Sequence, residues 1–201
     1  MSPRPRKASD EEVFAAAVRL MSRLGPHEIT LADIAGEAGI TASALVQRFG
    51  SKRALLLSLA EQMAGATGAT FAGFASRSPL ATIRAYGRCM AGLGPSAEAL
   101  AHNLAWLQQD LSDPDFRRCT LRQARATRRE LERLVREAVA AGELASDTDP
   151  AALARAIEIT VGGSLMAWAV YQEGTSAAWI AHDLERLLGP YLPRPTRVRR
   201  R

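Results

Sequence analysis

Apolar residues recur every three or four positions along most of the chain, which is the spacing that places them on one face of an α-helix. Ser78-Pro79, Asp113-Pro114 and Asp149-Pro150 each place a capping side chain directly before a proline at the first helical position. No segment alternates long enough to predict a strand. We therefore predict an all-α fold with helices over 10–24, 52–75, 79–92, 96–111, 114–141, 150–173 and 176–190, and two short helices between residues 30 and 52.

The segment from Thr30 to Lys52 predicts two short helices joined by a tight turn. The Thr30 hydroxyl can accept from the amide of Asp33 while the Asp33 carboxylate reaches back, as in a capping box. Gly39 stands where the chain must turn, and glycine adopts a positive φ without a Cβ clash. Thr41 caps the second helix, whose outer face carries small or polar side chains. A helix with such a slim outer face can enter a major groove and read base edges.

This segment resembles the DNA-binding head of TetR-family transcriptional repressors, whose pattern is approximately Thr-x-x-x-Ile-Ala-x-x-Ala-Gly-Val-Ser-x-x-x-Leu-Tyr-x-x-Phe-x-x-Lys-x-x-Leu. The matching positions are Thr30, Ile34, Ala35, Ala38, Gly39, Ile40, Thr41, Leu45, Phe49, Lys52 and Leu55. The resemblance covers about the first quarter of the chain. One position departs from the pattern, because Val46 stands where the family usually has a tyrosine that touches a phosphate. We expect that backbone contact to be missing.

The resemblance implies a three-helix, helix-turn-helix head joined to a larger helical domain that binds an effector and dimerises. We expect a disordered basic arm over 1–8, the DNA-binding domain over 9–54, the effector-binding and dimerisation domain over 55–192, and a basic tail over 193–201. The expected function is that of a ligand-responsive repressor, which binds a palindromic operator as a homodimer and is released by a small molecule. The residues alone leave activation open as the alternative to repression.

The helix geometry and the resemblance together give a set of DNA-contacting residues. Gln47 can pair bidentately with adenine, and Ala44 can meet a thymine methyl group. Lys52 begins a helix and is placed for a phosphate, although a solvated lysine is the simpler interpretation. A solvated tail is likewise the alternative for the basic arm. The predicted DNA-binding set is Arg6, Lys7, Thr30, Thr41, Ala42, Ser43, Ala44, Gln47, Arg48 and Lys52.

A small-molecule site is predicted among the middle helices. Most of the bulk of this region is small residues, and a few aromatic and methionine side chains among them can leave a cavity. The residues of this kind are Phe71, Tyr86, Met90, His102, Trp106, Met166 and Trp168. Plain core packing is the alternative for each of them. No charge cluster stands among them, so the expected effector is apolar or neutral. Gly65 and Gly68, within the predicted 52–75 helix, are interpreted either as a hinge or as a close helix contact.

The last two predicted helices are apolar enough to require cover, and in TetR-like proteins such helices form a four-helix bundle with a second copy. The residues expected at this dimer interface are Leu165, Trp179, Leu184, Leu187 and Leu188, with an intrachain core as the alternative. A two-fold dimer would present two heads to a palindromic site, with half-sites about 34–36 Å apart.

Composition limits these interpretations. Of 201 residues, 47% are hydrophobic and 23% charged, which is typical of a soluble globular protein. The net charge is +5, but five arginines stand in the last eight residues, and without them the body is formally neutral. DNA binding must therefore rest on where charges lie. No apolar segment follows the basic N-terminus as in a secretory signal, so Cys89 and Cys119 are expected to be reduced thiols in the cytoplasm.

Catalysis has little support in the sequence. His27, His102 and His182 are scattered without carboxylates at metal-ligand spacing, and no phosphate-binding glycine loop or nucleophile motif is present. We expect no cofactor and no metal. The alternatives to a regulator are a helical small-molecule-binding enzyme and a protein-binding adaptor, neither of which would bind DNA sequence-specifically.

Overall fold

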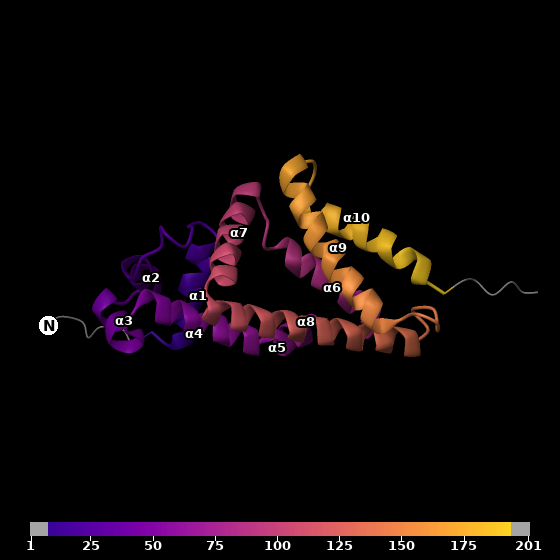
Figure 1. Ribbon diagram of the computed structural model, residues 1–201, viewed down its shortest axis with the longest axis horizontal. Coiled ribbons are helices and arrows are strands. Elements are labelled where there is room, and N and C mark those ends of the chain that lie inside the picture. The colour runs from indigo at the N-terminus through magenta and orange to yellow at the C-terminus, as the bar shows by residue number, and fades with distance from the viewer. Residues whose placement is uncertain (1–7, 194–201) are drawn as a thin grey trace, which may run out of the picture. The chain divides into compact units, whose positions relative to one another are not determined.

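The computed structural model describes residues 8–193, which contain α-helices, one short 3-10 helix and no strand (Figure 1). The predicted all-α fold is confirmed. The elements are α1 (Asp10–Met21), α2 (Leu31–Ala38), α3 (Ala42–Phe49), α4 (Lys52–Gly65), α5 (Thr67–Gly73), α6 (Pro79–Ala91), α7 (Ala97–Ser112), α8 (Pro114–Ala140), α9 (Pro150–Tyr171), α10 (Ser176–Leu188) and η1 (Gly189–Tyr191).

The chain forms two compact units, and each is built from two separate stretches of sequence. The first unit contains the described residues of Met1–Ala66 together with Ser96–Gln123. The second contains Thr67–Pro95 and the described residues of Ala124–Arg201. Helix α8 therefore begins in the first unit and ends in the second.

The helix starts follow the local chemistry of the sequence. Ser9 and Glu12 form a capping box, since the Glu12 amide donates to Ser9 Oγ at 3.2 Å and the Ser9 amide donates to Glu12 Oε2 at 2.9 Å. Thr30 and Asp33 form a second box with distances of 3.2 and 2.8 Å. Gly39 ends α2 with φ of 70°, the left-handed conformation that glycine adopts without a Cβ clash. The caps predicted at Thr30 and Gly39 are confirmed.

The single helix predicted over 52–75 is wrong, because the structure divides it into α4 and α5 at Ala66. The Ala66 amide donates to the carbonyls of Gln62 and Met63, which closes the last turn of α4. Gly65 and Gly68 stand on either side of this break, and each weakens a helix by about 1 kcal/mol relative to alanine. The break falls at the boundary between the two units.

The core of the first unit is shared by its two stretches of sequence. Val13, Ile34 and Leu45, from α1, α2 and α3, are fully buried in it. Trp106 of α7 and Phe116 of α8 belong to the same cluster. The Trp106 indole N–H donates to the carbonyl of Leu24 at 2.9 Å. Helix α7 and the first turns of α8 are therefore structural parts of the helix-turn-helix head.

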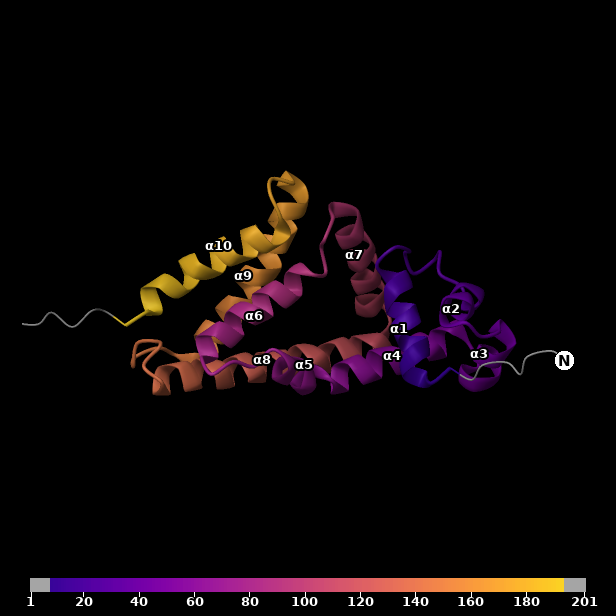
Figure 2. The ribbon, with the colours of Figure 1, turned by 180° about the vertical axis from the view of Figure 1, so that it is seen from behind.

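In the second unit, α10 packs against α9 and α6 (Figure 2). A Cβ added at Gly87 of α6 would lie 3.1 Å from Ile180 Cγ2, so glycine permits the close approach of α6 and α10. The Ser164 hydroxyl donates to Asp183 Oδ2 at 2.7 Å and joins α9 to α10. Within the described residues, one helix, α9, is long and apolar enough to cross a membrane, a test that core helices of soluble proteins also pass.

Candidate nucleic-acid interface

Helix α3 presents an exposed surface that is free of acidic residues. The Thr41 hydroxyl accepts from the Ala44 amide at 3.2 Å and caps the helix. Leu45 is fully buried and anchors the helix to the head. The opposite side is exposed, and we name its residues Ser43, Ala44, Val46 and Gln47 the recognition face. Apolar and uncharged side chains of this size suit a helix that enters the major groove.

The turn before α3 is fixed by backbone hydrogen bonds. The Ile40 amide donates to the Ala35 carbonyl at 2.9 Å, and the Gly39 amide donates to the Gly36 carbonyl at 3.2 Å. The rings of Phe14 and Phe49 lie 5.8 Å apart and join α1 to the end of α3. The recognition face is therefore presented by a rigid support, as precise base reading requires.

Arg48 serves the fold of the head. Its Nη1 donates to the Ala8 carbonyl at 2.6 Å, and its guanidinium pairs with Asp10 and lies 5.5 Å from the centre of the Phe49 ring. These contacts hold the start of α1 against the end of α3. Of the other predicted DNA contacts, Thr41 is exposed and Ala42 partly buried, while Arg6 and Lys7 lie outside the described residues.

Lys52 and Thr30 have structural partners as well. Lys52 Nζ donates to the carbonyls of Pro26 at 3.1 Å and Ile29 at 2.8 Å, which holds the loop between α1 and α2. An ammonium group has three donors, so the described part of the chain leaves one N–H of Lys52 for a phosphate. The Thr30 hydroxyl donates to Asp33 Oδ2 at 2.6 Å, so its proton is held within the capping box.

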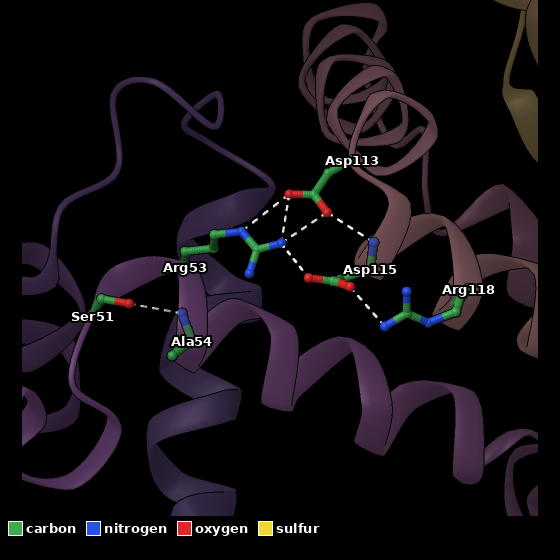
Figure 3. Close-up of polar contacts among 6 residues, drawn as sticks. All are labelled: Ser51, Arg53, Ala54, Asp113, Asp115 and Arg118. Carbon is green, nitrogen blue, oxygen red and sulfur yellow. Dashed lines mark hydrogen bonds and ion pairs between the residues drawn. The ribbon is translucent and has the colours of Figure 1, made fainter.

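Arg53 is the centre of an ion-pair cluster between the start of α4 and the corner that joins α7 to α8 (Figure 3). Its Nε and Nη2 donate to Asp113 at 2.8 to 3.1 Å, and Nη2 also donates to Asp115 Oδ2 at 2.6 Å. Arg118 Nη2 donates to the other oxygen of Asp115 at 2.7 Å. The Arg53 guanidinium also lies 5.7 Å from the centre of the Phe116 ring. The cluster ties the second sequence stretch to the head.

Replacing Arg53 with glutamine is expected to weaken the acid sensitivity of the protein. Hydrogen bonds from Arg53 lower the pKa of the Asp113 and Asp115 carboxyls, with Arg118 adding to the effect on Asp115. A lowered pKa stabilises the folded state above the unfolded value of about 3.9, and that stability is lost as pH falls through the folded value. R53Q should therefore lose less stability than the wild type below about pH 4.

The measurement is urea unfolding at a series of pH values between about 2 and 5. Arg122→Gln is the matched control, because Arg122 donates to the Glu61 carbonyl at 3.2 Å and forms no ion pair with a carboxylate among residues 8–193. An equal or steeper pH dependence in R53Q would contradict the assigned role of the cluster.

The residues predicted to bind an effector are divided between the two units. Trp106 is part of the head core. His102 lies on the same helix, and its buried Nδ1 has no hydrogen-bond partner among the residues that the structure describes. Phe71, Tyr86, Met90, Met166 and Trp168 belong to the second unit. The rings of Phe71 and Tyr86 stack with centroids 5.5 Å apart, whereas Met166 is exposed.

The environment of Tyr86 includes a charge pair that sequence reasoning missed. Burial, followed by the nearby Glu158 carboxylate, raises the pKa of Tyr86 to about 12. Glu158 of α9 is itself paired with Arg128 of α8. The two partners stand 30 residues apart, so no local spacing in the sequence predicts the pair. Tyr86 keeps its proton at neutral pH and offers an uncharged hydroxyl.

The predicted dimer residues also divide into two groups. Leu165, Leu184 and Leu188 are buried inside the second unit, so they form its core and offer no surface to a second copy. Trp179 and Leu187 are partly exposed. A different apolar surface lies on α9, where Ile159, Met166 and Val170 follow helical spacing and Val170 is 79% exposed. Gly162 and Gly163 lie exposed between them. Sequence periodicity predicted an apolar helix but not which side faced its own chain.

Two short capped helices, the second of which is exposed and carries no acidic side chain, are the arrangement found in helix-turn-helix DNA-binding proteins. The family models agree: residues 13–59 match "Bacterial regulatory proteins, tetR family", and residues 106–184 match "Tetracyclin repressor-like, C-terminal domain". The chain belongs to the TetR family of transcriptional regulators. It is accordingly a DNA-binding regulator and not an enzyme.

Solved structures of TetR-family regulators share the fold across nearly their whole length. A regulator from Haloarcula marismortui has 15% identity and a TM-score of 0.75, covering 92% of this chain and 98% of its own. SmeT, described as the repressor of the Stenotrophomonas maltophilia multidrug efflux pump SmeDEF, has 21% identity and a TM-score of 0.65 over 93% and 92%. Reduced Escherichia coli NemR has 16% identity and a TM-score of 0.73 over 93% and 99%. The search of curated proteins found no match.

Proposed function

We propose that the protein is a ligand-responsive repressor, which binds a palindromic operator as a homodimer and is released by a small-molecule effector. The observation that carries this proposal is the recognition face. It is exposed, has no acidic side chains and is anchored to the head through the buried Leu45. Repression rather than activation is supported by the fold shared with SmeT, which is described as a repressor. Because the proposed operator is DNA, the proposal implies that the protein acts in the cytoplasm.

The recognition face supplies the base contacts in this proposal. Gln47 pairs with adenine, Ser43 bonds a base edge, and Ala44 meets a thymine methyl group. Lys52, the first turn of α2, and the arm residues Arg6 and Lys7 contact phosphates, which position the protein without reading sequence. Binding should weaken as salt rises, since each neutralised phosphate releases counterions.

The exposed apolar side of α9 supports the homodimer. Replacing both Met166 and Val170 with glutamate is expected to produce a monomer, because a partner helix would have to desolvate four carboxylates in the dimer. Operator affinity should fall with it, since one head reads only one half-site. Sedimentation equilibrium at micromolar protein measures both states.

Leu121→Glu is the control for this prediction. Leu121 is an exposed apolar residue of α8 in the first unit, so the substitution adds charge without touching α9. The control should remain a dimer. If the M166E/V170E variant remained a dimer, the exposed apolar side of α9 would not be the dimer interface.

The effector site that we propose lies in the second unit around Phe71, Tyr86 and Met90. Two stacked aromatic rings and a thioether favour an apolar ligand body, and the uncharged Tyr86 hydroxyl favours a neutral hydrogen-bonding group. A tenfold loss of DNA affinity on ligand binding requires about 1.4 kcal/mol of coupling, which is common between two linked sites.

Selection from a random DNA library at physiological salt tests the proposal. Enrichment of a palindrome with half-sites about 34–36 Å apart is the expected result, and that operator then serves effector screens. The contrary result is salt-sensitive binding without sequence preference that disappears when residues 194–201 are deleted.

A further inference from the structure

Val46 is an apolar residue at the edge of the recognition face that lies next to Ser43. Its side chain is 48% exposed, whereas the neighbouring Leu45 is fully buried and carries the packing of α3. Ser43 precedes it by three positions and Ala42 by four, so these residues lie beside it on the helix surface. Val46 thus occupies a position from which the core gains little and which DNA would cover.

The chemistry of valine limits what it can recognise. Its side chain has no hydrogen-bond donor, so it cannot bind a phosphate oxygen. Two methyl groups on Cβ also hold it in one preferred rotamer within a helix, so it presents a fixed apolar surface. In the major groove, the apolar group at a base edge is the C5-methyl of thymine. The match is therefore between an exposed, rigid pair of methyl groups and a methyl group on DNA.

We propose that Val46 is a specificity-determining residue that contacts the methyl group of one thymine in each operator half-site. The proposal rests on the operator-binding function proposed above and adds a base preference to it. Contact with thymine is distinct from that expected for Ala44, which lies two positions earlier and consequently points in a different direction around the helix.

The test replaces the thymines of the selected operator with deoxyuridine, one symmetric pair at a time. This substitution removes only the methyl group and keeps base pairing. One buried methyl group corresponds to about a fourfold change in affinity, and two half-sites to about sixteenfold. When deoxyuridine replaces the symmetric thymine pair that Val46 contacts, the operator affinity of the wild-type protein should fall about sixteenfold. Fluorescence anisotropy with labelled operator measures the affinity.

Val46→Ala should bind thymine and deoxyuridine equally at that pair, while its sensitivity at every other thymine stays as in the wild type. Val46→Thr keeps the shape and one methyl group, so its fall in affinity on deoxyuridine replacement should lie between those of the wild type and Val46→Ala. If Val46→Ala binds too weakly to measure, Val46→Thr takes its place. Ala44→Gly is the matched control, and it should retain the full effect at the Val46 pair.

The proposal is overturned if Val46→Ala and Val46→Thr show the same deoxyuridine profile as the wild type. It is also overturned if no thymine of the operator is sensitive in the wild-type protein. Failure of the wild type to select any operator is a separate result, and it would overturn the proposed function as well.

Discussion

Replacing Ser43 and Gln47 together with alanine lowers affinity for the selected operator by about 30-fold or more, because a good bidentate base pairing contributes about 1–3 kcal/mol in each of two half-sites. Affinity for unrelated DNA stays unchanged, since phosphate contacts supply non-specific binding. The fold is kept, because the Ala44 amide still donates to the Thr41 hydroxyl that caps α3. Only the hydrogen bond between the Thr41 and Ser43 hydroxyls, 3.0 Å long, is lost. Anisotropy titrations with operator and scrambled duplexes measure the two affinities.

Gln62→Ala is the control for this result. Gln62 is an exposed glutamine on α4 of the same unit, so the change removes an amide from the head surface outside α3. It should leave both affinities unchanged. Equal operator affinity in the wild type and the double variant would show that α3 does not read the bases.

Trp106→Ala is expected to lower the free energy of unfolding of the head by about 3–5 kcal/mol, the usual cost of truncating a large buried aromatic residue. The substitution removes a member of the head core and the hydrogen bond to the Leu24 carbonyl. Trp106→Phe keeps most of the packing and should lose about 1–3 kcal/mol, because the Leu24 carbonyl loses its partner. Urea unfolding followed by far-ultraviolet circular dichroism measures both.

The two interpretations of Trp106 make different predictions. If Trp106 lines an effector site, its replacement would abolish the response to effector while stability and operator binding stayed intact. Trp179→Ala is the comparison in the second unit, where the side chain is partly exposed and its loss should cost less. A loss of less than about 1 kcal/mol in Trp106→Ala would contradict the structural assignment.

The features that could be predicted from the sequence are those set by chemistry within a few residues. Ser9, Thr30 and Thr41 cap helices because their partners stand three residues further along the chain. Gly39 was predictable for the same reason, since a tight turn after α2 requires a left-handed residue.

The features that could not be predicted depend on partners far apart in the chain. The structural contacts of Lys52 could not be predicted, because nothing in the sequence places the carbonyls of Pro26 and Ile29 against it. Arg53 and Asp113 stand 60 residues apart, and the spacing of neither residue indicates the other. Apolar periodicity identified α9 as a packed helix, but only tertiary contacts showed that Leu165 faces inward and Val170 outward.

The discontinuous head has a consequence for biosynthesis and for protein engineering. Because Trp106 and Phe116 complete its core, the head cannot finish folding on the ribosome until the start of α8 has emerged, well after the recognition helix. A chimeric regulator that takes only α1 to α4 would leave behind these two aromatic side chains and both carboxylate partners of Arg53. A transferable reading module from this chain must therefore carry Ser96–Gln123 along with α1 to α4.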